Sequence, residues 1–364
     1  MTRSLHSVPQ RILSAIAPRR FLTLLPVAIL ITAPALAQFP GLQLPQGSQS
    51  ASVKQTIGLT DLTVTYHRPA VNKRKVWGGL VPYGEVWRAG ANENTTFATT
   101  DDVSINGEKL AAGKYGVHMI PAAGEWTVIF SRDSASWGSF AYDEKADALR
   151  IKVTPKPSEF QERLGYTFDD PTEDSTTLSM RWEALRVPFT VKVDVPTVVL
   201  SKIRTQLKGL PQYPLVWSQA AAYSLGAGGN LDEALQWVDR SISRTRNFQN
   251  LRTKAAILEK RGDSAAATAL RNEAMTVATE ADMNAHGYGL MGQNKTSEAL
   301  AVFKKNVQNH PKSWNAHDSL AEAYALSGDK ASAIQSYSRA LELTTDPTQK
   351  TRIEKEIARV KSGV

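Results

Sequence analysis

The 364-residue sequence contains no cysteine. This absence excludes disulfide bonds, a thiol nucleophile and metal sites built on thiolates. The sequence also lacks a G-x-S-x-G nucleophile elbow, a Walker loop, a G-x-G-x-x-G fingerprint and an EF-hand loop. We therefore assign no catalytic residue, cofactor or metal, and we expect packed apolar cores to supply the stability.

Long apolar runs are also scarce, and the single one lies at residues 21–37. Four arginines and no acidic residue precede it, and it ends in Ala35-Leu36-Ala37. A basic region, a short apolar stretch and small residues at its end are typical of a secretory signal peptide. We predict cleavage after Ala37, export to the periplasm or out of the cell, and no membrane span in the mature chain. A single anchor helix is the alternative, although about 17 residues is the lower limit for a span.

Charge of one sign is not concentrated anywhere in the mature chain. The net charge is +8, but four of the arginines belong to the predicted signal peptide. Residues 38–195 hold 17 basic and 19 acidic side chains, and residues 196–364 hold 22 and 16. The basic residues form no dense stripe, so we expect no nucleic-acid partner.

The first half of the mature chain alternates apolar and polar residues with period two. Residues 38–51 are rich in Pro, Gly, Gln and Ser, which predicts a flexible linker. From 52 to 195 the alternation recurs in short segments, for example at 62–67 and 189–194, and Asn106-Gly107 suggests a tight hairpin turn. About nine short strands without a convincing helix predict an all-β, sandwich-like domain.

The second half, residues 196–364, has helical periodicity and repeats itself. Ala299 and Ala333 are 34 residues apart, as are Phe303 and Tyr337. This period resembles the tetratricopeptide repeat and predicts four helical hairpins and a final capping helix that ends near Gly363. A generic helical bundle is the alternative. The residues expected to pack between repeat helices are Ala299, Phe303, Tyr324, Gly328, Ala333, Tyr337 and Ala340.

Three motifs in residues 52–195 resemble the bacterial domain of unknown function 2911. They are a Tyr-x-Arg-Pro stretch, a Trp-Arg-x-Gly-Ala-Asn-Glu stretch and a Gly-x-Tyr strand. The resemblance implies an exported β-domain that is often joined to helical repeats, and it implies no reaction or ligand. The matching residues are Tyr66, Arg68, Pro69, Trp87, Arg88, Gly90, Ala91, Asn92, Glu93, Gly113 and Tyr115.

The dense polar run at Arg88, Asn92 and Glu93 has two interpretations. As a structural hub, Arg88 would pair with Glu93 and hold the turns by charge-assisted hydrogen bonds. As a site, Arg88 would bind a small polar or anionic ligand, or an uncharacterised hydrolase would centre on these three residues. The full candidate set, for ligand or hub, is Tyr66, Arg68, Trp87, Arg88, Asn92, Glu93 and Tyr115.

Histidine and tryptophan supply two further hypotheses. His67 and His118 with Glu93 or Glu85 would give a two-His, one-carboxylate metal site, but no local spacing motif supports it, and surface or half-buried histidines are expected instead. Carbohydrate binding would use exposed tryptophans near glycine-rich turns. Trp77, Trp87 and Trp137 fit that description, whereas Trp126 and Trp182 are predicted to be core.

Together these patterns predict a multidomain exported protein, with an all-β domain followed by an all-α repeat domain. Stacked helical hairpins present a groove suited to a peptide or helix, so the predicted function is non-enzymatic binding of a protein partner. The net charge of +6 in residues 196–364 favours acidic segments. The alternative is a small polar or carbohydrate ligand, or a hydrolase, in the β-domain.

Overall fold

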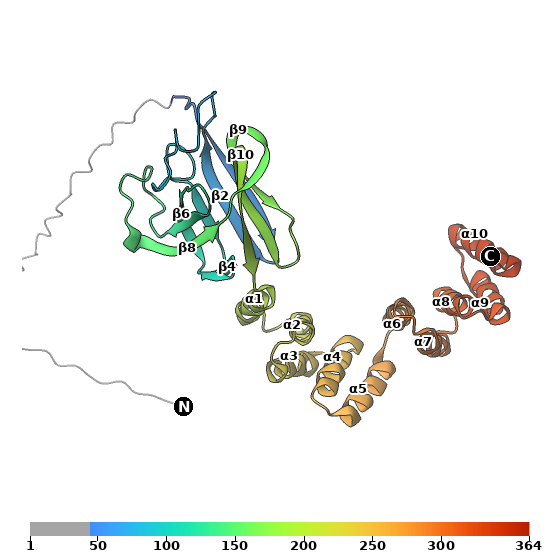
Figure 1. The fold of residues 1–364 in the computed structure, drawn as a ribbon. Coiled ribbons are helices and arrows are strands. Elements are labelled where there is room, and N and C mark those ends of the chain that lie inside the picture. The colour runs from blue at the N-terminus through green and yellow to red at the C-terminus, as the bar shows by residue number, and fades with distance from the viewer. Residues whose placement is uncertain (1–43, 364) are drawn as a thin grey trace, which may run out of the picture. The chain divides into compact units, whose positions relative to one another are not determined.

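The structure of the protein is a computed structural model that describes residues 44–363 (Figure 1). The predicted signal peptide and the first residues of the predicted linker lie outside this part of the chain. Within residues 44–363, no helix is long and apolar enough to cross a membrane.

The N-terminal part consists of two antiparallel sheets that share one apolar core. The six-stranded sheet has the order β1-β2-β3-β6-β7-β8, and the four-stranded sheet has the order β5-β4-β10-β9. This arrangement confirms the predicted all-β, sandwich-like domain. The strands are β1 (Gln49–Ile57), β2 (Thr60–Arg68), β3 (Thr96–Thr99), β4 (Val103–Ile105), β5 (Glu108–Leu110), β6 (Gly113–Ile120), β7 (Trp126–Ser131), β8 (Asp147–Val153), β9 (Lys156–Asp169) and β10 (Ser175–Val193).

The alternation in the sequence corresponds to one buried face on each strand. In β2, Leu62, Val64 and Tyr66 are buried, while the residues between them face outward. The turn between β4 and β5 contains only Asn106 and Gly107, with φ of 50° and 93°. Two consecutive positive φ values suit Asn-Gly and match the right-handed twist of a hairpin.

Three features of the sheets differ from the sequence-based expectations. The first strand begins at Gln49, so residues 49–51 belong to β1 rather than to the linker. Strand β9 has no clear alternation because most of its first half is exposed at a sheet edge. The alternating residues 189–194 were expected in a short strand, but they belong, up to Val193, to the 19-residue strand β10, whose pairing with β9 shifts register twice.

Four tryptophans meet in the core of this domain. Trp126 belongs to β7 and Trp182 to β10, so they come from different sheets. The centre of the Trp77 ring lies 4.8 Å from that of Trp126 and 5.7 Å from that of Trp182, and Trp87 stacks on Trp182 at 5.8 Å. Trp77 and Trp87 lie on the long connection between β2 and β3, which the cluster therefore holds against both sheets.

A helix, α1 (Val195–Gly209), follows β10 after the single residue Asp194. The Asp194 carboxylate accepts a hydrogen bond from the backbone N–H of Thr197 and so caps the helix. Val198 packs into the β core. Lys202 Nζ donates to Asp101 Oδ2 and to the carbonyl of Leu59, both at 2.7 Å. The sequence pattern did not single out this helix, which closes one end of the β-domain.

Four helical hairpins and a final helix make up the rest of the described chain, as the repeat period predicted. The hairpins are α2/α3, α4/α5, α6/α7 and α8/α9. Ala234, Ala267, Ala299 and Ala333 are fully buried, each on the second helix of a hairpin. The helices are α2 (Pro214–Gly226), α3 (Leu231–Arg244), α4 (Phe248–Lys260), α5 (Ser264–Val277), α6 (Glu280–Gly292), α7 (Thr296–Asn309), α8 (Trp314–Leu326), α9 (Lys330–Leu343) and α10 (Pro347–Ser362).

Both ends of the last helix carry the predicted signals. Asp346 accepts from the backbone N–H of Thr348, Pro347 is in the first turn, and Gly363 has φ of 82° at the C-terminal end. Ile353 and Val360 are buried against α8 and α9 residues. The buried apolar residues of the helical part form four clusters, over α1–α4, α4–α5, α6–α8 and α8–α10, and Ile242 and Tyr324 each pack against two of them.

The two helices of the α6/α7 hairpin approach each other closely at Gly287 of α6. A Cβ atom at Gly287 would lie 2.4–2.8 Å from ring atoms of the fully buried Phe303, whereas a Cβ at Gly289 would meet nothing within 4 Å. We predict that Gly287→Ala lowers the free energy of unfolding by about 1–3 kcal/mol through overpacking. Gly289→Ala, in the same helix, should raise it by roughly 0.5–1 kcal/mol. Urea unfolding of both variants tests this pair, and shifts of the same sign would contradict it.

Candidate functional site

The polar run of residues 87–95 is a tight loop in which several carbonyl groups accept hydrogen bonds from side chains. Ala89 and Asn92 adopt positive φ values of 51° and 57°. The Ala89 carbonyl accepts from Thr95 Oγ1 at 3.1 Å and from Tyr166 Oη at 2.9 Å. Trp87 Nε1 donates to the carbonyl of Gly90 at 3.1 Å. The loop is therefore a hydrogen-bonded hub in which side chains hold the backbone.

Arg88 occupies this hub in a different way from the one expected. Its Nη1 donates to the carbonyl of Asn92 at 2.7 Å, and its guanidinium carbon lies 5.3 Å from the Trp137 ring centre and 5.7 Å from that of Phe140. Burial lowers the pKa of Arg88. The expected Arg88–Glu93 pair is wrong, because among the described residues Glu93 pairs with His67, at 3.1 Å between Oε2 and Nε2.

The other candidate residues divide between this hub and a second place. Tyr66 is buried edge-to-face against Tyr166, and Arg68 Nε donates to the carbonyl of Leu164 at 3.0 Å. Asn92 Nδ2 donates to the carbonyl of Ser48 at 3.1 Å. Tyr115 instead donates through its hydroxyl to the carbonyl of Ala111 and lines a separate cavity. The sequence-based set is therefore not one site.

His118 is buried, with 3% of its surface exposed, whereas a surface or half-buried position was expected. Its Nδ1 lies 2.8 Å from Ser139 Oγ, and its ring lies 5.2 Å from that of Tyr142. Burial is the main cause that lowers the pKa of His118, against the opposing charges of Asp147 and Asp133. A neutral imidazole beside a hydroxyl suits general-base chemistry. Among the described residues, however, no carboxylate bonds the other ring nitrogen, and no three potential ligands gather around a metal position.

The exposed tryptophan of the β-domain is Trp137. Its side chain is 60% exposed and stacks on Phe140, 82% exposed, with ring centres 6.1 Å apart and an angle of 16° between the rings. Trp77, expected near the surface, is only 7% exposed, and Trp87 is half-buried in the tryptophan cluster. Trp126 and Trp182 are core residues, as predicted.

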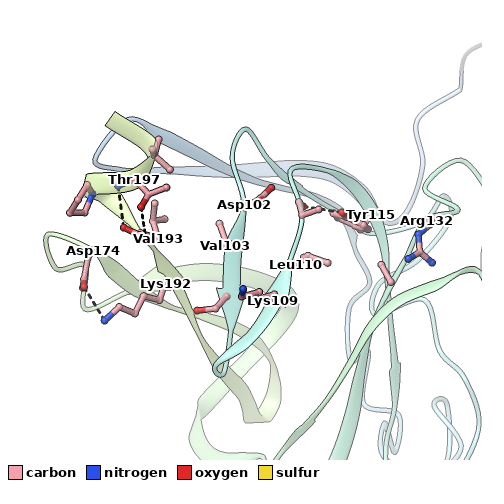
Figure 2. Close-up of a pocket in the computed structure, with 16 residues that line it drawn as sticks. Asp102, Val103, Lys109, Leu110, Tyr115, Arg132, Asp174, Lys192, Val193 and Thr197 are labelled. Atoms are coloured by element: carbon pink, nitrogen blue, oxygen red, sulfur yellow. Dashed lines mark hydrogen bonds and ion pairs between the residues drawn. The ribbon is translucent and has the colours of Figure 1, made fainter. Parts of the chain in front are cut away.

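A cavity of about 900 Å³ lies where strands β4, β5 and β10 meet the start of α1. Figure 2 shows Tyr115 and Arg132 at one end of this cavity and the Asp174–Lys192 pair at the opposite end. Its apolar lining includes Val103, Leu110, Val193 and Val198, all of them almost fully buried. This cavity, called here the junction cavity, combines an apolar floor with charged side chains.

A second cavity, of about 670 Å³, lies between helices α4, α5, α6 and α7 of the repeats. Its lining includes three cationic side chains and a histidine, namely Arg252, Arg271, Lys295 and His286. It also includes one acidic side chain, Glu298. This cavity is called the repeat cavity below.

Within the repeat cavity Arg252 lacks a compensating charge. Arg271 pairs with Glu259 at 2.9 Å, and Lys295 lies 3.8 Å from Glu298. In the described part of the chain no carboxylate lies within ion-pair distance of Arg252, whose guanidinium sits 5.1 Å from the centre of the Phe248 ring. Burial and then the charge of Arg271 lower the pKa of Arg252, and burial and then the charge of Arg252 lower the pKa of His286.

Comparison with known protein families decides the identity of the β-domain. The family described as "Protein of unknown function (DUF2911)" matches residues 48–191. These residues are a DUF2911 domain. No curated protein matches the chain.

The helices that follow the DUF2911 domain are similar to solved tetratricopeptide-repeat structures. YrrB, titled a TPR protein with an unusual peptide-binding site, is 15% identical over 44% of this chain and 84% of its own, with a TM-score of 0.26. A thermophilic TPR protein of Thermus thermophilus, TTC0263, is 19% identical over 44% and 90%, with a TM-score of 0.25. The C-terminal part of a TPR repeat-containing protein from Cytophaga hutchinsonii is 13% identical over 46% and 67%, with a TM-score of 0.31.

The contacts of Arg88 and Glu93 indicate that these two residues contribute unequally to the stability of the DUF2911 domain. We predict that Glu93→Ala lowers the free energy of unfolding by less than about 1 kcal/mol, because its pair with His67 is half-exposed. Arg88→Ala should cost more, about 1–3 kcal/mol, because the loop loses a charge-assisted hydrogen bond and its contact with two rings. Chemical unfolding measures both, with the exposed Glu85→Ala as the control. Equal losses for Arg88→Ala and Glu93→Ala would restore the ion-pair hypothesis.

Proposed function

We propose that the protein is an exported, non-enzymatic binding protein and that its repeat cavity holds an acidic segment of a protein partner. The observation that carries the proposal is Arg252, a half-buried cation without an ion-pair partner among the described residues. Burying a charge is unfavourable unless an opposite charge compensates it. A carboxylate in the repeat cavity would supply that compensation.

The surroundings of Arg252 reinforce the preference for an anion. Arg271 lies close enough for its charge to lower the pKa of Arg252, and the pKa of His286 is lowered in turn by Arg252. Two guanidinium groups in one cavity, of which only Arg271 is paired with a carboxylate, leave a positive potential that attracts an acidic ligand. A planar guanidinium also binds a carboxylate through two parallel hydrogen bonds, which favours Asp or Glu side chains or a chain terminus.

The apolar part of the repeat cavity determines what kind of acidic molecule fits. Phe248, Met275 and Leu290 line the cavity beside the cations. The ring of Phe248 contacts that of His286, with centres 5.9 Å apart, so residues of α4 and α6 meet there. An acidic segment that also carries apolar side chains would satisfy both parts of the lining, as in other helix or peptide grooves.

The function is tested with the mature chain and peptides selected from a random peptide library. We predict that selected peptides are rich in Asp and Glu, and that Arg252→Ala weakens their binding by about 10–100-fold, the equivalent of one charged hydrogen bond of roughly 1.5–3 kcal/mol. The matched control is Arg244→Ala, which removes an exposed arginine of α3 outside the cavity and should leave binding unchanged. Peptides without acidic residues, or equal binding by the two variants, would overturn the proposal.

A second candidate function is carbohydrate binding by the DUF2911 domain. The observation that favours it is the stacked and exposed pair of Trp137 and Phe140, with Arg88 close to both rings. Flat exposed rings stack on the apolar faces of sugar rings, and the neighbouring cation favours an anionic sugar.

The carbohydrate candidate is tested on a glycan array that includes uronic acids. We predict that Trp137→Ala abolishes binding to the glycans that the wild type binds. Phe160→Ala should leave this binding unchanged, because Phe160 is an exposed ring of β9 away from this pair. Absence of any wild-type signal, or equal signals from both variants, would remove this candidate.

A further inference from the structure

The junction cavity has the composition of a small-molecule site, and neither proposed function uses it. Its volume of about 900 Å³ lies within the usual range of ligand sites, about 300–1,000 Å³. Val103, Leu110, Val193 and Val198 give it an apolar floor, and each is also part of the shared β core. The floor is therefore fixed by packing and exists without a ligand.

The acidic residues around the junction cavity already have partners. Asp174 pairs with Lys192 at 3.0 Å. Asp194 accepts from the backbone N–H and the hydroxyl of Thr197, at 3.1 and 2.8 Å. Asp102 accepts from the backbone N–H of Ala112 at 2.8 Å. Each of the three carboxylates therefore already accepts an ion pair or a hydrogen bond from the protein, and Asp194 is used as the cap of α1.

Two cations of the lining remain uncompensated. Among the described residues, Lys109 and Arg132 have no carboxylate within ion-pair distance, although both are exposed at the cavity. Arg132 Nη1 donates to the carbonyl of Asp147 at 2.7 Å, which fixes the guanidinium and leaves its other N–H groups for a ligand. Figure 2 shows Arg132 next to Tyr115, at the end of the cavity away from the Asp174–Lys192 pair.

From this distribution we infer that the junction cavity binds a long-chain carboxylate. The carboxylate lies near Lys109 and Arg132, and the alkyl chain extends over the apolar floor toward Val193 and Val198. Charge complementarity favours a negative head, and we place the head at this end because Lys192, at the opposite end, already pairs with Asp174. Tyr115, a residue of the Gly-x-Tyr motif, forms part of the wall at the head end.

The position of the cavity connects ligand binding to the start of the helical part. Pro196, Thr197 and Val198 of α1 line the same cavity as β4 and β5. Lys202 of α1 reaches back to Asp101 at 2.7 Å, so this wall is tied to the β-domain by an ion pair as well as by Val198. A bound alkyl chain would add apolar contacts between α1 and the sheet and so stabilise their packing.

The inference is tested by titrating the mature chain with dansyl-undecanoic acid and following dansyl fluorescence. We expect saturable binding, and a loss of about tenfold in affinity in the double variant Lys109→Ala/Arg132→Ala. The control double variant Lys114→Ala/Lys145→Ala removes two exposed lysines outside the cavity and should bind like the wild type. Ala148→Phe, which places a ring in the cavity lining, should also weaken binding, independently of charge.

Two further measurements distinguish binding of the carboxylate from non-specific binding of the alkyl chain. The methyl ester of the same probe should bind about tenfold more weakly than the acid, because it cannot form the charged contact. Binding of the acid should weaken as salt is raised, since exposed charges are screened. No saturable binding to the wild type, equal binding of ester and acid, or equal binding by the two double variants would overturn the inference.

Discussion

The packing of four tryptophans between the two sheets is the constraint on which the β-domain depends. Trp126 and Trp182 bring the sheets together, and Trp77 and Trp87 hold the connection from β2 to β3 against them. Trp87 also exchanges backbone hydrogen bonds with Met119 of β6, both at 2.8 Å. Because that residue is held on both its ring and its backbone, the loop that follows it has little freedom, and Arg88 is directed toward the segment that carries Trp137 and Phe140.

The surfaces most suited to binding share one electrostatic property, which is a cation that no carboxylate within residues 44–363 neutralises. Arg252 lies in the repeat cavity and Lys109 with Arg132 in the junction cavity, while Arg88 rests on aromatic rings and a carbonyl. Residues 38–195 have nearly balanced charge, and residues 196–364 have only a modest positive excess. Overall charge therefore says little about recognition here, and the local pairing of each cation says more.

The architecture was predictable because it depends on local patterns, and the sites were not because they depend on contacts across the fold. Alternation gave the buried face of β2, Asn106-Gly107 gave a hairpin, and the 34-residue period gave the helical hairpins. The pairing of Arg88 failed as a prediction because Glu93 is close in sequence but turns to His67 of β2. The absence of a carboxylate beside Arg252 in the described part of the chain depends on four helices, and no sequence pattern reports which carboxylates lie near it.

Neighbouring apolar clusters of the helical part share a packed residue, Ile242 or Tyr324, except at the boundary between α5 and α6, and this difference affects how the helical part unfolds. Cooperativity in a repeat array depends on the coupling between neighbours, and weak coupling lets one segment open while the others remain native. The clusters of α4–α5 and α6–α8 share no residue, and the repeat cavity lies at their boundary. We expect the coupling between neighbouring repeats to be weakest at that boundary, which the Phe248–His286 contact crosses, so a ligand that bridges α4 and α6 would strengthen it.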